Sequence, residues 1–263
     1  MKRTLATILA LALVPFLAPL AGAQYATDFE AFNASTAGVP VAGQDGFYNP
    51  VPASSVDFLA YPYAGNPLTI PVNPKGGKQF IACVGPAGSP VFYGRSERLM
   101  AWCGAKWTMG FDILANFTGT GTATDNLGSV STQPSATNEG FIALVRWSTP
   151  GTHWKVSYQV YDAANVSSYQ DVADPNFVNL PVNQWYRWET DFDFSTHLIT
   201  EVRLTDLATM TTWKNQPVGW YLRGGSAGAA RPTGFRFFAG SGVAGNLLAY
   251  DNVNLTMHAA GIK

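Results

Sequence analysis

Short runs in which apolar and polar residues alternate recur along almost the whole chain, and they constrain the fold more than any other feature. Clusters of Gly, Pro, Asn, Ser and Thr separate them. Side chains two apart lie on one face of a β-strand, so the runs predict strands rather than helices. The clearest runs are QFIACV from Gln79, WTMGFDILANF from Trp107, FIALVRW from Phe141, HWKVSYQVY from His153, WYRWETDFDF from Trp185, LITEVRL from Leu198, TGFRFF from Thr233 and LLAYDNVNLTM from Leu247. This many strands bury their apolar faces best between two sheets, and we expect an all-β, two-sheet antiparallel β-sandwich.

The first 23 residues predict a secretory signal peptide. Two basic residues precede an apolar run that prolines interrupt, and Ala21 and Ala23 form an AxA-like cleavage site before Gln24. The sequence therefore predicts a secreted protein, extracellular or periplasmic. All-β sandwiches commonly reach about 200–250 residues as one unit, so we expect residues 24–263 to form a single domain.

The net charge of the mature chain argues against a nucleic-acid partner, and the shortness of its apolar stretches argues against a membrane span. Removing Lys2 and Arg3 leaves 14 Lys and Arg against 17 Asp and Glu, which is a net charge of −3. A chain with this balance has no basic field for nucleic acid. No later stretch approaches the roughly 20 apolar residues that cross a bilayer. We expect neither a nucleic-acid partner nor a membrane span.

The two cysteines, Cys83 and Cys103, predict a disulfide. Both lie in the exported part of the chain, and an oxidising compartment favours pairing. Closing a loop of about 20 residues would stabilise the fold by roughly 3 kcal/mol in the chain-entropy model. The alternative is two buried free thiols. A metal site built on them is not expected, because neither has a Cys or His partner at a ligand spacing.

The two ends of the mature chain carry a second pattern. Residues 28–48 read DFEAFNASTAGVPVAGQDGFY, and residues 247–255 read LLAYDNVNL. The first has an FE pair, a Gly and a GQ-G-aromatic turn; the second has an acidic DN pair. Together they resemble the opening and closing strands of secreted concanavalin A-like lectin/glucanase (LamG-like) jelly-roll domains. The resemblance covers most of residues 25–257 and implies a concanavalin A-like jelly roll in which the first and last strands pair.

The same resemblance implies a structural calcium ion where the two end strands meet. Ca²⁺ takes carboxylate and carbonyl oxygens, and Glu30 and Asp251 could supply two ligands, with Asp28 as a third candidate. The alternative is that Glu30 and Asp251 are edge charges or accept hydrogen bonds from loop amides.

The segment from Trp185 to Phe194 places Glu189, Asp191 and Asp193 at every second position. Laminarinase and lichenase members of the family carry a row of the form ExDxE or ExDxxE, in which the first Glu is the nucleophile, the Asp assists it and the last Glu is the acid/base. The resemblance therefore makes these three residues the alternative catalytic set. Here, however, Asp replaces the final Glu, and residues 194–197 predict the tip of a hairpin. A retaining pair needs carboxyl groups about 5–5.5 Å apart, whereas residues four apart on a strand are separated by roughly 13 Å. We therefore favour the solvated or ligand-facing side of an amphipathic strand, with no catalytic residue.

The same strand face predicts a binding surface. Trp185, Arg187 and Glu189 share one parity, and an indole, a guanidinium and a carboxylate suit a sugar. Our leading hypothesis is a secreted, non-catalytic jelly roll that binds a glycan or a cell-envelope polysaccharide. The alternatives are a retaining glycoside hydrolase or polysaccharide lyase, and a surface-structural or adhesive subunit whose exposed strand edges pair between copies.

Overall fold

The computed structural model describes residues 22–85, 94–116, 126–133, 139–228, 231–240 and 245–258. The predicted signal peptide lies outside the described residues, except for the last two positions before Gln24. No helix in the described part of the chain is long and apolar enough to cross a membrane.

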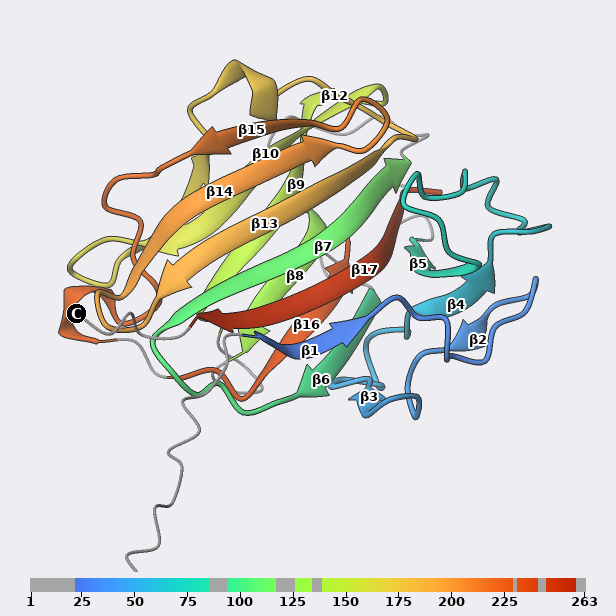
Figure 1. Cartoon of the computed structure of the whole chain (residues 1–263), viewed down its shortest axis with the longest axis horizontal. Helices are drawn as coiled ribbons and strands as arrows, with labels where there is room; N and C mark the ends of the chain where they lie inside the picture. Colours follow the sequence, from blue (N-terminus) through green and yellow to red (C-terminus); the bar gives the residue numbers. More distant parts are fainter. Residues whose placement is uncertain are drawn as a thin grey trace, which may run out of the picture.

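Within these residues the strands form two antiparallel sheets packed face to face (Figure 1). The front sheet has the order β15-β14-β13-β7-β17-β5-β4-β2, and β1 also pairs with β17. Its strands are β15 (Thr211–Asn215), β14 (Leu198–Asp206), β13 (Trp185–Asp193), β7 (Lys106–Asn116), β17 (Leu247–His258), β5 (Gln79–Val84), β4 (Leu59–Pro62), β2 (Val39–Pro40) and β1 (Gly22–Thr27).

The back sheet has the order β11-β10-β9-β8-β16-β6-β3, and β12 also pairs with β10. Its strands are β11 (Ser167–Asp171), β10 (His153–Tyr161), β9 (Phe141–Thr149), β8 (Asn126–Gln133), β16 (Gly234–Ala239), β6 (Gly94–Leu99), β3 (Phe47–Tyr48) and β12 (Leu180–Pro181). Two single-turn 3₁₀ helices, η1 (Pro175–Phe177) and η2 (Gly225–Ala227), are the helical elements of the described chain. The predicted two-sheet antiparallel β-sandwich is confirmed.

The core between the sheets is rich in aromatic rings, and β13 shows how alternation builds it. Tyr186, Trp188 and Phe192 point inward and are at most 2% exposed. Trp188 stacks on Trp154 of β10 at a centroid distance of 6.3 Å, and its indole N–H donates to the hydroxyl of Tyr158 at 2.7 Å. Burying one such ring contributes on the order of 2–3 kcal/mol. The other face of the strand is left for charged residues.

Strand β17 lies at the centre of the front sheet and has three partners. One of its edges pairs with β7 along most of its length, and the other pairs first with β5 and then with β1. The chain's first and last described strands are thus neighbours, as the resemblance implied. The register of the β17–β7 pair shifts between Asp251 and Asn254, and Asn252 there has φ +45°. This is a β-bulge, which re-aims side chains locally.

The predicted disulfide is wrong, because Cys83 and Cys103 are both free. Cys83 lies opposite Leu248, near the start of β17. Cys103 contacts the other end of that strand, with its Sγ 3.8 Å from Sδ of Met257. Nine residues of β-strand separate these positions by about 30 Å, whereas a disulfide needs Cα atoms within about 7 Å.

Candidate functional site

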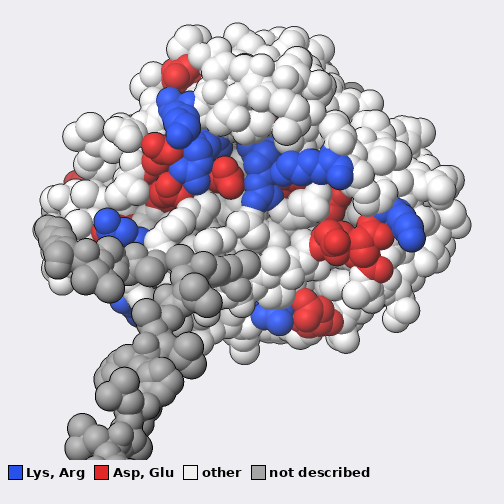
Figure 2. Space-filling view, in the orientation of Figure 1, with Lys and Arg blue, Asp and Glu red and all other residues white. Residues whose placement is uncertain are grey.

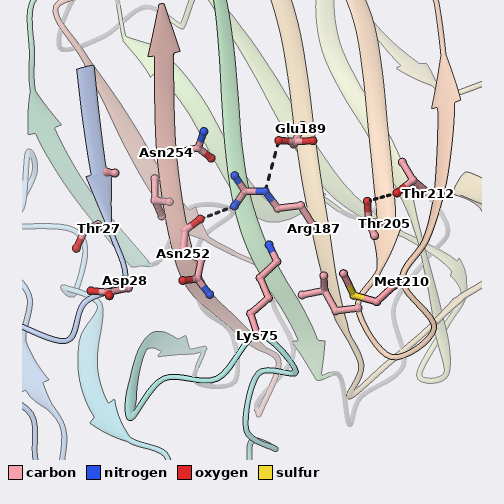
Figure 3. Close-up of a pocket in the computed structure, with 13 residues that line it drawn as sticks. Thr27, Asp28, Lys75, Arg187, Glu189, Thr205, Met210, Thr212, Asn252 and Asn254 are labelled. Carbon is pink, nitrogen blue, oxygen red and sulfur yellow. Dashed lines mark hydrogen bonds and ion pairs between the residues drawn. The ribbon is translucent and has the colours of Figure 1, made fainter. Parts of the chain in front are cut away.

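An open groove of about 720 Å³ lies on the outer face of the front sheet (Figure 3). Strands β13, β14 and β17, the end of β1, the turn between β14 and β15, and the loop between β4 and β5 all contribute to it. The residues that line it are Ala26, Thr27, Asp28, Lys75, Arg187, Glu189, Thr205, Leu207, Met210, Thr212, Asn252, Val253 and Asn254. Most of them carry hydroxyl, amide or charged groups.

A glycine in the middle of β7 shapes the floor of the groove. Gly110 lies opposite Glu189 on one side and Asn254 on the other. A methyl group at Gly110 would overlap Nη2 of Arg187 and would lie 2.7 Å from Oδ1 of Asn254. The missing side chain therefore lets the Arg187 guanidinium lie across β7 and donate to the backbone carbonyl of Asn252 in the bulge of β17. Glycine inside a strand often marks such a close approach.

Seven charged side chains of this face form one connected series of ion pairs, which we call the ion-pair ladder. It runs from the edge strand β15 to the loop before β5: Lys214, Glu201, Arg203, Glu189, Arg187, Asp112 and Lys75. The successive N–O distances are 3.7, 2.7, 3.2, 3.7, 3.2 and 2.9 Å. Figure 2 shows basic and acidic side chains side by side across the middle of this face. Each charge in the ladder is met by at least one of opposite sign, so the groove presents a balanced surface.

The three carboxylates of the alternative catalytic set are all held by structural partners, and Glu189 and Asp191 share one of them. Arg203 binds Asp191 through two hydrogen bonds, of 2.6 and 2.8 Å, and also donates to Glu189 at 3.2 Å. Burial raises the pKa of Asp191, but the hydrogen bonds from Arg203 and from Thr108 outweigh it and bring the pKa below its usual value. A general acid needs the opposite shift.

Asp193 ends β13 and belongs to the hairpin. Its Oδ1 accepts from the backbone N–H of Ser195 at 2.7 Å and from its hydroxyl at 2.6 Å. Strand β14 begins at Leu198, so the predicted hairpin tip over residues 194–197 is confirmed. The structure does not bring Asp193 to the groove.

The structure divides the expected binding patch. Arg187 and Glu189 line the groove, but Trp185 does not. Trp185 has the same parity, yet it is only 2% exposed. It packs with Tyr63 and other apolar residues of a second, smaller core, and its indole N–H donates to the carbonyl of Pro71 at 2.8 Å. The loop between β4 and β5 thus covers this indole.

Glu30 and Asp251 both lie close to Gly77. A methyl group at Gly77 would be 3.2 Å from Oε1 of Glu30 and 3.7 Å from Oδ2 of Asp251. Glu30 also accepts the backbone N–H of Gln79 at 3.1 Å. Asp28 lines the groove, and its Oδ1 accepts from the backbone N–H of Glu30 at 3.1 Å.

Asp251 is 1% exposed and its hydrogen-bond donors are neutral groups: the hydroxyl of Tyr63 at 2.8 Å, the amide of Asn73 at 3.3 Å and the backbone N–H of Asn252 at 2.7 Å. Burial raises its pKa to about 7, and the neighbouring Asp112 adds to the shift. Among the described residues, no three His, Cys, Asp or Glu side chains form a cluster that could hold a metal ion. Any cation here would therefore need backbone or amide oxygens as well.

Sequence reasoning missed several groove residues. Asn252 was noted only as part of the DN pair, although Asn252 and Asn254 share one parity in the last strand and could have been recognised as a polar row. Lys75 and Met210 come from a loop and a turn, where no periodicity indicates which way a side chain points.

Comparisons with known proteins yield distant similarities only. No protein-family model matches the chain, and no curated protein matches it. Among solved structures, the cellulose-induced protein Cip1 is 13% identical with a TM-score of 0.49, over 91% of this chain and all of that one. An alginate lyase from Pseudomonas aeruginosa is 9% identical with a TM-score of 0.42, over 68% of this chain and 83% of that one.

The binding domain of botulinum neurotoxin serotype G is 9% identical with a TM-score of 0.42. The similarity covers 70% of this chain but only 41% of that structure. None of these values indicates a ligand or an activity.

Proposed function

We propose that the protein is a secreted, non-catalytic carbohydrate-binding β-sandwich of the LamG-like kind, and that its ligand lies in the groove on the front sheet. The observation that carries this proposal is the composition of the groove: amides, hydroxyls, a guanidinium, an ammonium and carboxylates, all on one open surface. Sugar hydroxyls both donate and accept hydrogen bonds, and planar polar side chains match their geometry.

The charge balance of the groove favours a neutral glycan over a polyanion. Lys75 and Arg187 both bind Asp112, at 2.9 and 3.2 Å, and Glu189 lies between two arginines. A ligand carboxylate would find these cations already neutralised. A neutral sugar can instead use the donors and acceptors that point away from these pairs.

The same ion pairs support binding rather than hydrolysis. Glycosidases use two carboxyl groups whose environments separate their pKa values. Here Glu189 and Asp191 share Arg203, whose hydrogen bonds help to bring the pKa of Asp191 below its usual value, and Asp193 is a turn residue.

The test is binding of the purified protein to neutral and acidic oligosaccharides by isothermal titration calorimetry, with cellohexaose, laminarihexaose, xylohexaose and an oligomannuronate as probes. We expect at least one neutral probe to bind. Glu189→Gln should weaken that binding about tenfold, because a hydrogen bond to a charged group contributes about 1.5–3 kcal/mol.

Glu201→Gln is the matched control. Glu201 also binds Arg203, at 2.7 Å, but it does not line the groove. The affinity of the Glu201→Gln variant for the neutral probe should therefore stay within about twofold of the wild-type value. Absence of binding to all the neutral probes would contradict the proposal. Release of reducing ends or unsaturated products, abolished by Glu189→Gln, would replace it with an enzymatic function.

We also propose a structural Ca²⁺ ion between Glu30 and Asp251. Gly77 leaves space beside both carboxylates, and a cation would offset the unfavourable burial of Asp251 next to Asp112. Asp28 is the third candidate ligand. The ion would hold together the start of the chain, the loop before β5 and the last strand.

A further inference from the structure

One residue of the groove has a backbone conformation that its side chain does not favour. Met210, in the turn between β14 and β15, has φ +57°. The left-handed region is unfavourable for residues with a Cβ atom, and Asn, Asp and Gly tolerate it best. Most of the other non-glycine residues with positive φ in the described chain are of the tolerant kind or His. The complete set is Phe29, Asp45, Thr69, Asn165, Asn179, Asn183, His197, Met210 and Asn252.

The other two unusual residues have local compensation. Phe29 is completely buried, and its ring packs edge-on against Phe32 at a centroid distance of 5.2 Å. The hydroxyl of Thr69 donates to the carbonyl of Leu68 at 2.7 Å. Met210 is instead 64% exposed, so burial offsets little of the strain.

The turn itself is firmly built and would accept a better-suited residue. Asp206 accepts from the backbone N–H of Ala208 at 2.8 Å and from the hydroxyl of Thr209 at 3.0 Å. Asp206 also lies opposite Thr211, so residues 207–210 form the hairpin loop. A left-handed residue at the end of such a loop is usually Gly or Asn. Folding alone therefore gives no reason for methionine.

The position of Met210 in the groove does give a reason. In the described chain, Met210 is the large apolar side chain that is both exposed and part of the groove lining. Leu207 and Val253 also line it but are at most 2% exposed. In Figure 3, Met210 lies at one end of the groove and Thr27 and Asp28 lie at the other, with Lys75 and Arg187 between them. The groove thus has polar groups along its floor and one flexible, polarisable side chain at its end.

We infer that Met210 is a ligand contact that packs against the C–H face of a pyranose ring, and that the ligand is a neutral glycan with such a face. This inference rests on the function proposed above. Sugar-binding sites commonly combine hydrogen bonds with one apolar contact surface, and the groove lining contains no aromatic ring. Methionine adapts its shape to irregular surfaces. Strained residues persist where function requires them, and the strain at Met210 is retained for binding.

The test compares stability and affinity in the same variants. Met210→Asn and Met210→Gly suit the left-handed turn, so we expect Tm to be unchanged or raised by up to about 4 °C. Binding of the neutral probe that the wild type binds should weaken about tenfold, because the apolar contact is lost. Met210→Leu keeps an apolar side chain and should recover most of the affinity.

Oxidation gives an independent measurement. Hydrogen peroxide transfers one oxygen atom to an exposed thioether, giving a polar sulfoxide and water. Treated wild-type protein should lose affinity, and treated Met210→Leu should lose much less.

The outcomes separate the inference from the proposed function. If the wild type binds no neutral probe, the proposed function fails and the inference with it. If the wild type binds and Met210→Asn binds equally well, only the inference fails. A clear drop in Tm for both Met210→Asn and Met210→Gly would also overturn it, because Met210 would then have a structural role.

Discussion

The ion-pair ladder and the buried region around Asp251 both hold carboxylates in the front sheet, but they neutralise them in different ways. In the ladder, Arg203 of β14 binds Glu201 at 2.7 Å, and it also binds Asp191 of β13 at 2.6 Å. Around Asp251, the hydrogen-bond donors are a phenol, an amide and a backbone N–H. The two regions shift carboxyl pKa values in opposite directions: below the usual value for Asp191 and up to about 7 for Asp251.

The contrast is sharpest between Asp112 and Asp251, which lie opposite each other on β7 and β17. Both are at most 1% exposed, and one amide, that of Asn73, donates to both at 2.9 and 3.3 Å. Lys75 and Arg187 bind Asp112, whereas Asp251 has neutral donors. Burial alone therefore does not decide how a carboxylate is held; the charge of its partners does.

The largest expected effect is a fall in stability between about pH 4 and pH 7 in buffer that contains a chelator. The folded-state pKa of Asp251 is raised from 3.8 to about 7, so in this window the folded state keeps a proton that the unfolded state has released. Stability is then highest at the acidic end and decreases as pH rises to about 7. About three pKa units correspond to roughly 4 kcal/mol. Urea unfolding at several pH values measures this slope.

Asp251→Asn is the control, because an amide does not titrate. The slope between pH 4 and pH 7 should disappear in this variant. An unchanged slope would show that another group is responsible. Below about pH 4 the sign reverses: carboxylates with lowered pKa, such as Asp191, become protonated and their stabilisation is lost as pH falls.

The second prediction concerns the removal of Arg203, the cation of the ladder that binds three carboxylates. Arg203→Ala leaves Glu189, Asp191 and Glu201 without their shared cation. Since these groups are partly buried, we expect the free energy of unfolding at pH 7 to fall by about 2–3 kcal/mol. Lys214→Ala at the exposed end, where the pair is 3.7 Å long, should cost less than about 0.5 kcal/mol. Equal losses in the two variants would contradict the view that Arg203 neutralises this region.

Local pattern was enough to predict much of this architecture. Alternation correctly separated the core side chains of β13 from its charged side chains, because the parity of a strand depends only on neighbouring residues. The hairpin after Asp193 also followed from local residues. The partners of each charge could not be predicted, because Arg203 reaches Asp191 only through the register of β13 and β14.

Two of the failures involve contacts with segments far away in the sequence. Trp185 has the parity of an exposed residue but is covered by the loop that includes Pro71, 114 positions away. Cys83 and Cys103 are close in sequence but lie at opposite ends of β17. The failure at Met210 is local, because its turn conformation is one that its residue type does not predict.

The smallest expected effect is the stabilisation by Ca²⁺, which would give the region around Asp251 a cation, as the ladder has. If Ca²⁺ binds between Glu30 and Asp251, it supplies there the positive charge that Arg203 supplies to Asp191. At 1 mM Ca²⁺ and a dissociation constant of about 0.1 mM, mass action gives about 1.4 kcal/mol of added stability. The ion binds the carboxylate form, so it should also flatten the slope between pH 4 and pH 7. Differential scanning calorimetry with Ca²⁺, with Mg²⁺ and with a chelator measures both effects, and Glu30→Gln should abolish them. A Tm that a strong chelator leaves unchanged would rule out the ion. Of the opposed carboxylates Asp112 and Asp251, Asp251 would then be the one held without a cation.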